Sequence, residues 1–223
     1  MERIFGNRRE AGRILADHLK EYKSKENLLV LGLPRGGVPV AFEVAKALDA
    51  DLDIFVVRKL DTPGHEELAM GAIAGGDTRV INEDVVEYLH IPEDAIEMET
   101  RREQEEVRKR EAMYREGGKV PVSAEGRPVI LVDDGLATGA SMMAAVKTLR
   151  QQNPSAITVA VPVASPSVRN KLAEDADDII CVQTPRAFSA VGAWYDDFTP
   201  TTDEEVKDLL KEWASMHQSV AGS

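Results

Sequence analysis

The sequence predicts an α/β fold, a doubly wound and mostly parallel sheet with helices on both faces. Two observations carry this prediction. Short apolar segments with strand character alternate with segments of helical periodicity along most of the chain. The connections between the strands are also long enough for the helical crossovers that parallel strands require. In sheets of this kind, ligands lie beyond the carboxyl ends of the strands.

The first part of the chain predicts helices, strands and one hairpin. Apolar residues at helical spacing near the amino end indicate an amphipathic helix. Residues 60–70 contain Pro63, Gly64 and three acids without periodicity, so a flexible loop is expected there, able to act as a lid. In order, we expect a helix within 1–22, a strand at 28–32, a helix ending near Leu48, a strand at 53–57, the loop, and a hairpin of 71–74 with 78–81.

Residues 93–116 differ in kind, because 15 of these 24 residues are charged. They include four pairs of opposite charge at i,i+4 in the favourable order, each worth about 0.2–0.5 kcal/mol. The segment therefore predicts a long, largely solvated helix inserted into the fold and ending at Gly117-Gly118. A coiled-coil partner is the alternative, although few of the required positions are apolar. The pairs are Glu97–Arg101, Glu105–Lys109, Glu106–Arg110 and Glu111–Arg115.

The second part of the chain resumes the alternation. An irregular segment at 185–200, which contains Trp194, Tyr195 and Phe198, separates the last strand from the last helix. We expect all of 1–223 to form one domain, since a chain of this length suffices for one core. The predicted strands are 129–132, 157–161 and 178–182, and the predicted helices are 140–152, 166–173 and 202–213.

Composition excludes several classes of protein. The formal net charge of −12 argues against a nucleic-acid binder, because phosphate backbones require clustered Lys and Arg. Cys181 is the single cysteine, so no intrachain disulfide and no Cys-rich zinc site is expected. No apolar run is long enough to cross a bilayer, and the amino end lacks the apolar stretch of a signal peptide, so we expect a cytoplasmic protein without a membrane partner.

The acidity is unevenly distributed along the chain. Residues 83–116 carry a net −6, residues 174–178 a net −4 and residues 196–212 a net −5, which leaves +3 for the remainder. The net charge therefore describes the periphery of the molecule and says little against a site for a phosphorylated metabolite.

Residues 129–141, VILVDDGLATGAS, are the most informative segment. An apolar strand delivers Asp133 and Asp134 to its carboxyl end, and a turn of small residues then opens a helix. Backbone N–H groups, the hydroxyls of Thr138 and Ser141, and the helix dipole form a phosphate cradle of neutral groups. The adjacent carboxylates only accept hydrogen bonds, which suits sugar hydroxyls or water on Mg²⁺. A ligand with both a phosphate and vicinal hydroxyls, such as a ribose 5-phosphate, fits this combination.

Other phosphate motifs fit less well. Residues 32–37 have the glycine spacing of a P-loop, but Val38-Pro39 stand where Lys and Ser or Thr are required. No G-x-G-x-x-G follows a strand, so a dinucleotide site lacks support. A response-regulator receiver domain also places acids after an apolar strand, but normally after its first strand, whereas these acids end a late one.

Residues 129–141 resemble the phosphoribosyl-diphosphate (PRPP) motif of type I phosphoribosyltransferases. Leu33-Pro34-Arg35-Gly36-Gly37 resembles the early pyrophosphate loop of that family, often built with a cis peptide, and Val57-Arg58-Lys59 resembles the strand end that leads into its flexible catalytic loop. The resemblance extends over nearly the whole chain to bacterial phosphoribosyltransferase-like proteins whose acceptor is not established. It implies candidate catalytic residues Asp133 and Asp134 on the ribose hydroxyls, Ala137, Thr138, Gly139, Ala140 and Ser141 on the 5-phosphate, and Arg35, Gly36, Gly37, Arg58 and Lys59 on pyrophosphate.

The resemblance implies transfer of a phosphoribosyl group from PRPP to a small nitrogenous acceptor, with Mg²⁺ held through substrate and water rather than by direct protein ligands. It implies a place in nucleotide metabolism and the homodimers common among relatives. A PRPP-sensing regulator and a sugar-phosphate hydrolase are the alternatives. In the family, the segment that covers the site, the hood, selects the acceptor; here it is 185–200. Its aromatic side chains would either stack a flat base or pack against the last helix.

Overall fold

The central sheet has five parallel strands in the order β2-β1-β6-β7-β8. The computed structural model describes residues 5–75, 78–115 and 120–218. The predicted α/β class with a mostly parallel sheet is confirmed. The strands are β1 (Leu29–Gly32), β2 (Asp51–Ile54), β6 (Pro128–Val132), β7 (Ala156–Val163) and β8 (Asp178–Gln183).

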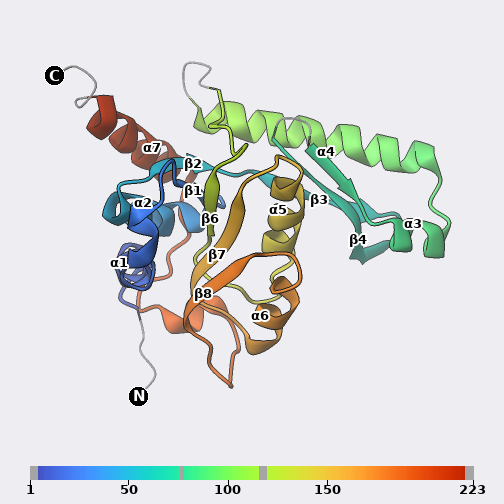
Figure 1. Cartoon of the computed structure of the whole chain (residues 1–223). Helices are drawn as coiled ribbons and strands as arrows, with labels where there is room; N and C mark the ends of the chain where they lie inside the picture. Colours follow the sequence, from blue (N-terminus) through green and yellow to red (C-terminus); the bar gives the residue numbers. More distant parts are fainter. Residues whose placement is uncertain (1–4, 76–77, 116–119, 219–223) are drawn as a thin grey trace.

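Helices cover both faces of this sheet (Figure 1). In β6, Ile130 and Val132 belong to the core cluster formed with α1, α2 and α7, whereas Val129 and Leu131 belong to the cluster formed with α5 and α6. Successive side chains of a strand point to opposite faces, so the continuous apolar run is buried on both sides. The helices are α1 (Arg8–His18), α2 (Gly37–Leu48), α5 (Ala140–Arg150), α6 (Pro166–Leu172) and α7 (Asp203–Gln218).

A second, antiparallel sheet of three strands projects from the central one, in the order β3-β4-β5. Its strands are β3 (Val57–Thr62), β4 (His65–Ala74) and β5 (Thr78–Ile81). The expected hairpin of 71–74 with 78–81 is confirmed by the pairing of β4 with β5. Two other predictions are wrong. Residues 60–70 are a hairpin rather than a loop, and the strand expected at 53–57 is divided between β2 and β3.

Both errors have a physical reason. The apolar run at 54–57 is continuous, but Phe55 and Val56 are buried at the crossover where the chain changes its pairing partner. The hydrophobic pattern of a sequence indicates which residues are buried, but it does not indicate which strands pair with each other. In the hairpin, Leu60 and Met70 are fully buried, because the long charged helix covers them. The register of β3 with β4 also shifts on both sides of Asp61, which hides the alternation expected of a strand.

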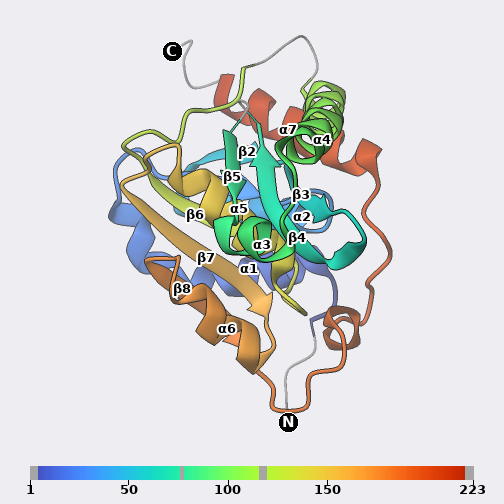
Figure 2. The ribbon, with the colours of Figure 1, turned by 90° about the vertical axis from the view of Figure 1, so that its right-hand side faces the viewer.

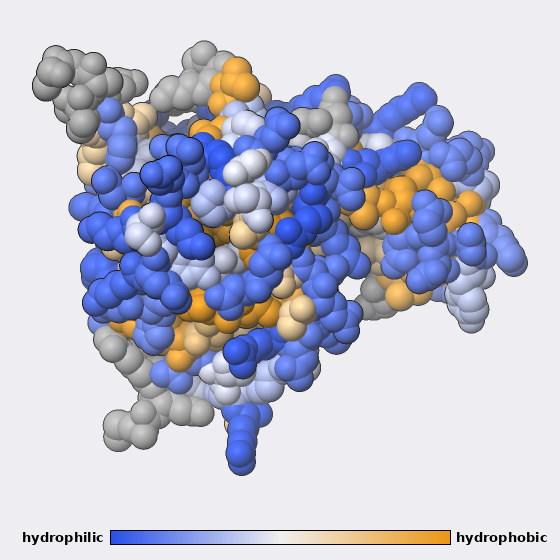
Figure 3. Space-filling model, viewed as in Figure 1, coloured by the Kyte–Doolittle hydropathy of each residue, from blue (hydrophilic) through white to orange (hydrophobic). Residues whose placement is uncertain are grey.

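The second sheet, α3 (Glu83–Leu89) and α4 (Glu93–Tyr114) form an arm beside the central sheet (Figures 1 and 2). Helix α3 was not predicted from the sequence. The space-filling view shows an apolar surface on this arm, which lies over β3 and β4 and below α4 in the picture (Figure 3). Within the part of the chain that the structure describes, no helix is long and apolar enough to cross a membrane.

The expected long helix is α4, but it is less solvated than predicted. The pairs Glu97–Arg101 and Glu105–Lys109 form at 3.2 Å each on its surface. A stripe of the helix is nevertheless buried, and it includes Glu99 and Glu103. Charge in a buried stripe conceals the apolar periodicity by which a packed helix is normally identified.

The segment 185–200 folds back on the amino end of the chain. It contains a short 3₁₀ helix, Val191–Trp194, and the Phe5 N–H donates to the Trp194 carbonyl at 2.8 Å. Its aromatic residues pack on Phe5, on α1 and on the end of β7, not on the last helix as one alternative expected. The other 3₁₀ helix among the described residues is Lys20–Ser24, after α1.

Candidate functional site

The neighbouring strands β1 and β6 bring two predicted segments together. Gly32 lies opposite Val132 in the parallel register, and the Leu33 N–H donates to the Val132 carbonyl at 2.9 Å. Because both strands end at the same edge, the loop 33–37 and the segment 133–141 meet there. Both segments were predicted from sequence motifs, which do not contain the distance between them.

The glycines of the first loop lie directly against the two carboxylates. A methyl group placed on Gly37 would lie 2.6 Å from the Val132 carbonyl oxygen and 3.1 Å from Asp133 Oδ1. A methyl group on Gly36 would overlap the carboxylate of Asp134. The adjoining Pro34–Arg35 peptide bond is cis. This close approach explains why the loop has no side chain at either glycine position.

The two carboxylates are differently bonded. Asp133 Oδ1 accepts from the N–H of Asp134 at 2.8 Å, while Asp134 Oδ2 accepts from Nε of Arg8 at 2.8 Å. The Tyr195 hydroxyl donates to the Asp134 carbonyl at 2.6 Å. Burial raises the pKa of Asp133 well above its usual value, and the neighbouring charge of Asp134 adds to the effect. Burial also raises the pKa of Asp134, against the opposing influence of Arg8.

The turn after the carboxylates leads into the amino end of α5. Gly139 precedes the first turn with a φ of 72°, a left-handed conformation that favours glycine. The Ala140 N–H donates to the Thr138 hydroxyl at 3.4 Å, and Ala137, Thr138 and Ser141 are exposed. The first amides of a helix lack intrahelical acceptors and carry its positive dipole end. This turn therefore has the geometry of an anion cradle open to solvent.

Hydrogen bonds fasten this turn to the next strand. The Leu136 N–H donates to the Val163 carbonyl at 2.9 Å, at the end of β7. The Ser165 hydroxyl donates to the Ala137 carbonyl at 3.0 Å. The cradle is thus held between two neighbouring parallel strands, which fixes it relative to the carboxylates.

The three predicted cations are placed differently. Arg35 is exposed in the first loop, with NH1 3.9 Å from Oδ2 of Asp203. Arg58 and Lys59 are successive residues of β3, so their side chains point to opposite faces. Nε of Arg58 donates to Glu103 of α4 at 2.6 Å, and this hydrogen bond to the Glu103 carboxylate raises the pKa of the guanidinium against the effect of burial.

Lys59 faces the cradle side. It lines a hollow of about 450 Å³ between β4 and α5, whose wall includes Ala140 and Met143. The structure therefore brings Lys59 to the amino end of α5 and places Arg58 against α4. The sequence motif could not separate them, because adjacent residues share a motif but not a face.

Two residues at the site were missed by the sequence analysis as site residues. Arg8 lies in the first turn of α1, where a charged residue of an amphipathic helix carries no signal of its own. Tyr195 was noted only as one aromatic of the segment 185–200. No sequence pattern links either of them to Asp134, from which they are 126 and 61 residues distant.

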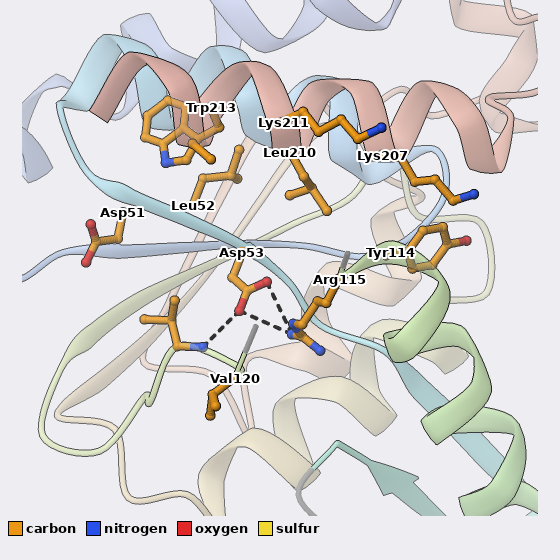
Figure 4. Close-up of a pocket in the computed structure, with 12 residues that line it drawn as sticks. Asp51, Leu52, Asp53, Tyr114, Arg115, Val120, Lys207, Leu210, Lys211 and Trp213 are labelled. Carbon is orange, nitrogen blue, oxygen red and sulfur yellow. Dashed lines mark hydrogen bonds and ion pairs between the residues drawn. The ribbon is translucent and has the colours of Figure 1, made fainter. Parts of the chain in front are cut away.

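A separate hollow of about 300 Å³ lies at the edge strand β2, beside α7 (Figure 4). One of the carboxylates that line it, Asp53, accepts from NH2 of Arg115 at 3.1 Å and from the Val122 N–H at 2.9 Å. These bonds give Asp53 a structural role, because they connect β2 to the residues at and after the end of α4. Among the residues that the structure describes, no group of three or more His, Cys, Asp or Glu side chains could hold a metal ion.

Comparison with known proteins shows the family of the chain. The family model of the phosphoribosyl transferase domain matches residues 3–197. Proteins of two Mycobacterium tuberculosis strains, CDC 1551 / Oshkosh and H37Rv, each named "putative phosphoribosyl transferase", are 43% identical over 209 residues. That match covers 93% of this chain and 46% of theirs, so the chain spans about half the length of these relatives.

One further relative and one solved structure also match the chain. The bifunctional protein PyrR of Geobacter sp. strain M21 is 30% identical over 160 residues, 71% of this chain and 70% of that protein. The crystal structure of TT1426 from Thermus thermophilus superposes with a TM-score of 0.87 at 43% identity, covering 95% of this chain and 99% of that one. From the matched family model and these identities, the chain belongs to the phosphoribosyl transferase domain family.

Proposed function

We propose that this chain binds PRPP and transfers its phosphoribosyl group to a nitrogenous small molecule, with release of pyrophosphate. The observation that carries the proposal is the meeting of the glycine loop, the two carboxylates and the α5 cradle at one edge of the sheet. Asp133 and Asp134 bind the ribose hydroxyls, and residues 137–141 bind the 5-phosphate. Arg35, Gly36, Gly37 and Lys59 bind the pyrophosphate group.

The reaction breaks the bond between ribose C1 and the pyrophosphate oxygen, whose electron pair leaves with the pyrophosphate. The lone pair of the acceptor nitrogen forms the new bond to C1, and the nitrogen loses its proton to solvent. The transition state resembles an oxocarbenium ion, as in glycoside cleavage. Fixed backbone amides and the cationic side chains stabilise the departing charge without reorganisation.

Mg²⁺ fits this arrangement as a companion of the substrate. Two adjacent carboxylates, one of them already bonded to Arg8, are too few protein ligands for a dedicated magnesium cage. Asp133 and Asp134 instead accept hydrogen bonds from sugar hydroxyls and from metal-bound water. When bound with PRPP, the ion supplies positive charge to the pyrophosphate group.

Arg58 has a less direct part in the proposal. Its guanidinium is engaged by Glu103, so it contributes positive potential from behind β3, while Lys59 provides the contact. Pyrophosphate binding by Arg58 itself requires the Glu103 pair to open. The Arg58→Lys variant therefore serves as a test: a large loss of pyrophosphate affinity would favour direct contact.

The acceptor enters under the segment 185–200. Two aromatics of this segment are already engaged, with ring centroids 5.4 Å apart for Phe5–Tyr195 and 5.0 Å apart for Tyr195–Phe198. This packing argues against base stacking on Tyr195. The acceptor nitrogen must reach C1 from the side opposite the pyrophosphate.

The proposal is tested by incubating the protein with PRPP, Mg²⁺ and a panel of nucleobases and other nitrogenous acceptors, with pyrophosphate release followed by ³¹P NMR. The expected result is release that depends on one acceptor and is absent in Asp134→Asn. Release without any acceptor would indicate a hydrolase. Binding of PRPP by calorimetry without release under any condition would indicate a regulator, and absence of binding would refute the PRPP site altogether.

A further inference from the structure

Arg8 joins three parts of the candidate site. Its Nε donates to Asp134 Oδ2 at 2.8 Å and its NH1 donates to the Thr199 carbonyl at 2.7 Å. Its guanidinium carbon lies 3.9 Å above the centre of the Phe198 ring. The Arg8 side chain is 11% exposed and that of Asp134 is 14% exposed. One buried guanidinium thus contacts a proposed ribose-binding carboxylate and the segment that covers the site.

We infer that Arg8 is a positioning residue, which orients the Asp134 carboxylate for the ribose and makes that orientation depend on the seating of residues 195–199. This inference rests on the proposed function. Beyond that function, Arg8 of the amino-terminal helix links the acceptor side of the site to the PRPP side.

The geometry favours an arginine in this place. The planar guanidinium offers several N–H donors in a fixed arrangement, so it can bond a carboxylate and a carbonyl while it stacks on a ring. Asp134 has little freedom, because Gly36 lies against the carboxylate on one side and Tyr195 bonds its carbonyl on another. With Arg8 bonded to Oδ2, the inference leaves Oδ1 of Asp134 for the ribose hydroxyls.

The amino end of the chain is built to hold Arg8 there. Asn7 caps α1 by accepting the N–H of Glu10 at 2.9 Å, which starts the helix immediately before Arg8. The backbone of Phe5 and Gly6 accepts from the N–H groups of Asp196 and Asp197 at 2.8 and 2.9 Å. These bonds align the start of α1 with residues 195–199, so a displacement of that segment would displace Arg8 too.

The test is a double-mutant cycle on PRPP affinity, measured by calorimetry with Mg²⁺ for the wild type, Arg8→Gln, Asp134→Asn and the double variant. Each single change is expected to weaken binding about ten-fold or more, as for loss of a hydrogen bond between charged groups. The double variant is expected to bind no more weakly than Asp134→Asn, because Arg8 acts through that carboxylate. Additive losses, or an unchanged affinity in Arg8→Gln, would overturn the inference.

Arg9 provides the matched control. It bonds Glu43 at 2.6 Å and lies 5.0 Å from the Phe42 ring centre, so Arg9→Gln loses the same kinds of contact away from the carboxylates. Arg9→Gln is expected to lower the melting temperature without changing PRPP affinity. Arg8→Lys, which keeps the charge but not the planar set of donors, is expected to bind more tightly than Arg8→Gln and less tightly than the wild type.

Phe198→Leu tests the link to the covering segment without touching the ion pair. It is expected to weaken PRPP binding several-fold, because it removes the ring on which Arg8 rests. An unchanged affinity in a folded Phe198→Leu protein would refute the link. Failure of the wild type to bind PRPP would instead refute the proposed function, so the two failures are told apart by the wild-type measurement.

Discussion

Individual residues at this site are constrained by contact with one another more than by their own chemistry. Asp133 and Asp134 are ordinary acids at the end of a strand until Gly36 and Gly37 approach them and Arg8 and Tyr195 bond one of them. Their raised pKa values arise from burial, which is a consequence of tertiary packing.

Gly36→Ala is expected to damage the site sterically. The added methyl overlaps the Asp134 carboxylate, so Asp134 must move and its bond to Arg8 must lengthen. Crowding of this kind typically costs about 1–3 kcal/mol of stability. PRPP affinity measured by calorimetry should fall about ten-fold or more.

The control for this change is Gly126→Asn. Nothing lies within 4 Å of a Cβ atom placed at Gly126, and Asn tolerates its φ of 69° better than most residues do. Gly126→Asn should leave PRPP affinity unchanged. Equal affinity in Gly36→Ala and the wild type would contradict the proposed packing of the loop on Asp134.

Asp133→Asn is expected to stabilise the unliganded protein at neutral pH. The pKa of Asp133 in the folded state exceeds its ordinary value of 3.8, so the folded state holds the proton more tightly. Stability is therefore lost as the pH rises above 3.8 through the folded-state pKa. Asn removes this loss and can still accept the Asp134 N–H. A gain of about 1 kcal/mol would raise the melting temperature by roughly 2–4 °C.

The measurement is the melting temperature of wild type and variant at pH 4.5 and pH 8, where the gain should be larger at pH 8. Asp177→Asn is the control of opposite sign. Burial raises the pKa of Asp177, but bonds from the Ile157 N–H and from Arg150 outweigh it and the pKa is lowered. Asp177→Asn should therefore lose stability at pH 8. The same response in both variants would show that the two sites do not differ as described.

At the scale of elements, α4 is the part of the chain whose role the structure redefines. Its exposed pairs at i,i+4 were readable from the sequence. Its buried side was not, because Glu99 and Glu103 occupy positions that normally carry apolar residues. Glu103 is matched by Arg58 of β3 and by Arg102, so the helix is fastened to the hairpin by charge as well as by apolar contact.

Glu103→Ala is expected to destabilise the arm. Burial acts to raise the pKa of Glu103, but hydrogen bonds from Arg58 and Arg102 outweigh it and the pKa lies below its usual value of 4.5. This stabilisation is present above pH 4.5 and is lost as the pH falls below it. Breaking a buried pair costs about 3–5 kcal/mol, and the 38% exposure of Arg58 reduces this to roughly 1–3 kcal/mol.

Urea unfolding at pH 7 measures the change, with Glu97→Ala as the control. Glu97 pairs with Arg101 on the exposed side of the same helix, and its side chain is 53% exposed. Its loss should cost no more than about 0.5 kcal/mol. If the two variants were equally stable, the Arg58–Glu103 pair would not fasten α4 to β3.

At the scale of the whole molecule, the site is assembled from segments that are distant in sequence. Residues 133–141 lie between the loop 33–37, the first turn of α1 and the segment 195–199. The start of the chain and the segment before the last helix are held together by backbone bonds. Ligand binding should therefore stabilise the entire central fold and not one loop alone.

The corresponding prediction is a thermal shift. At PRPP and Mg²⁺ concentrations about 100-fold above the dissociation constant, linkage adds about 2.7 kcal/mol to the unfolding free energy. For a domain of this size the melting temperature should rise by roughly 5–10 °C. Ribose 5-phosphate, which lacks the pyrophosphate group, should give a smaller rise. Equal shifts for both compounds would contradict pyrophosphate binding by the first loop.

The sequence by itself determined the α/β class, the order of the central strands and helices along the chain, and the segments proposed to bind PRPP. It could do so because burial on both faces and turns of small residues leave local patterns. Tertiary structure alone decided that 60–70 is a hairpin, that Arg58 and Lys59 face opposite ways, and that Arg8 and Tyr195 reach Asp134. Those outcomes depend on which strand pairs with which and on contacts across more than 60 residues, and no local pattern records either.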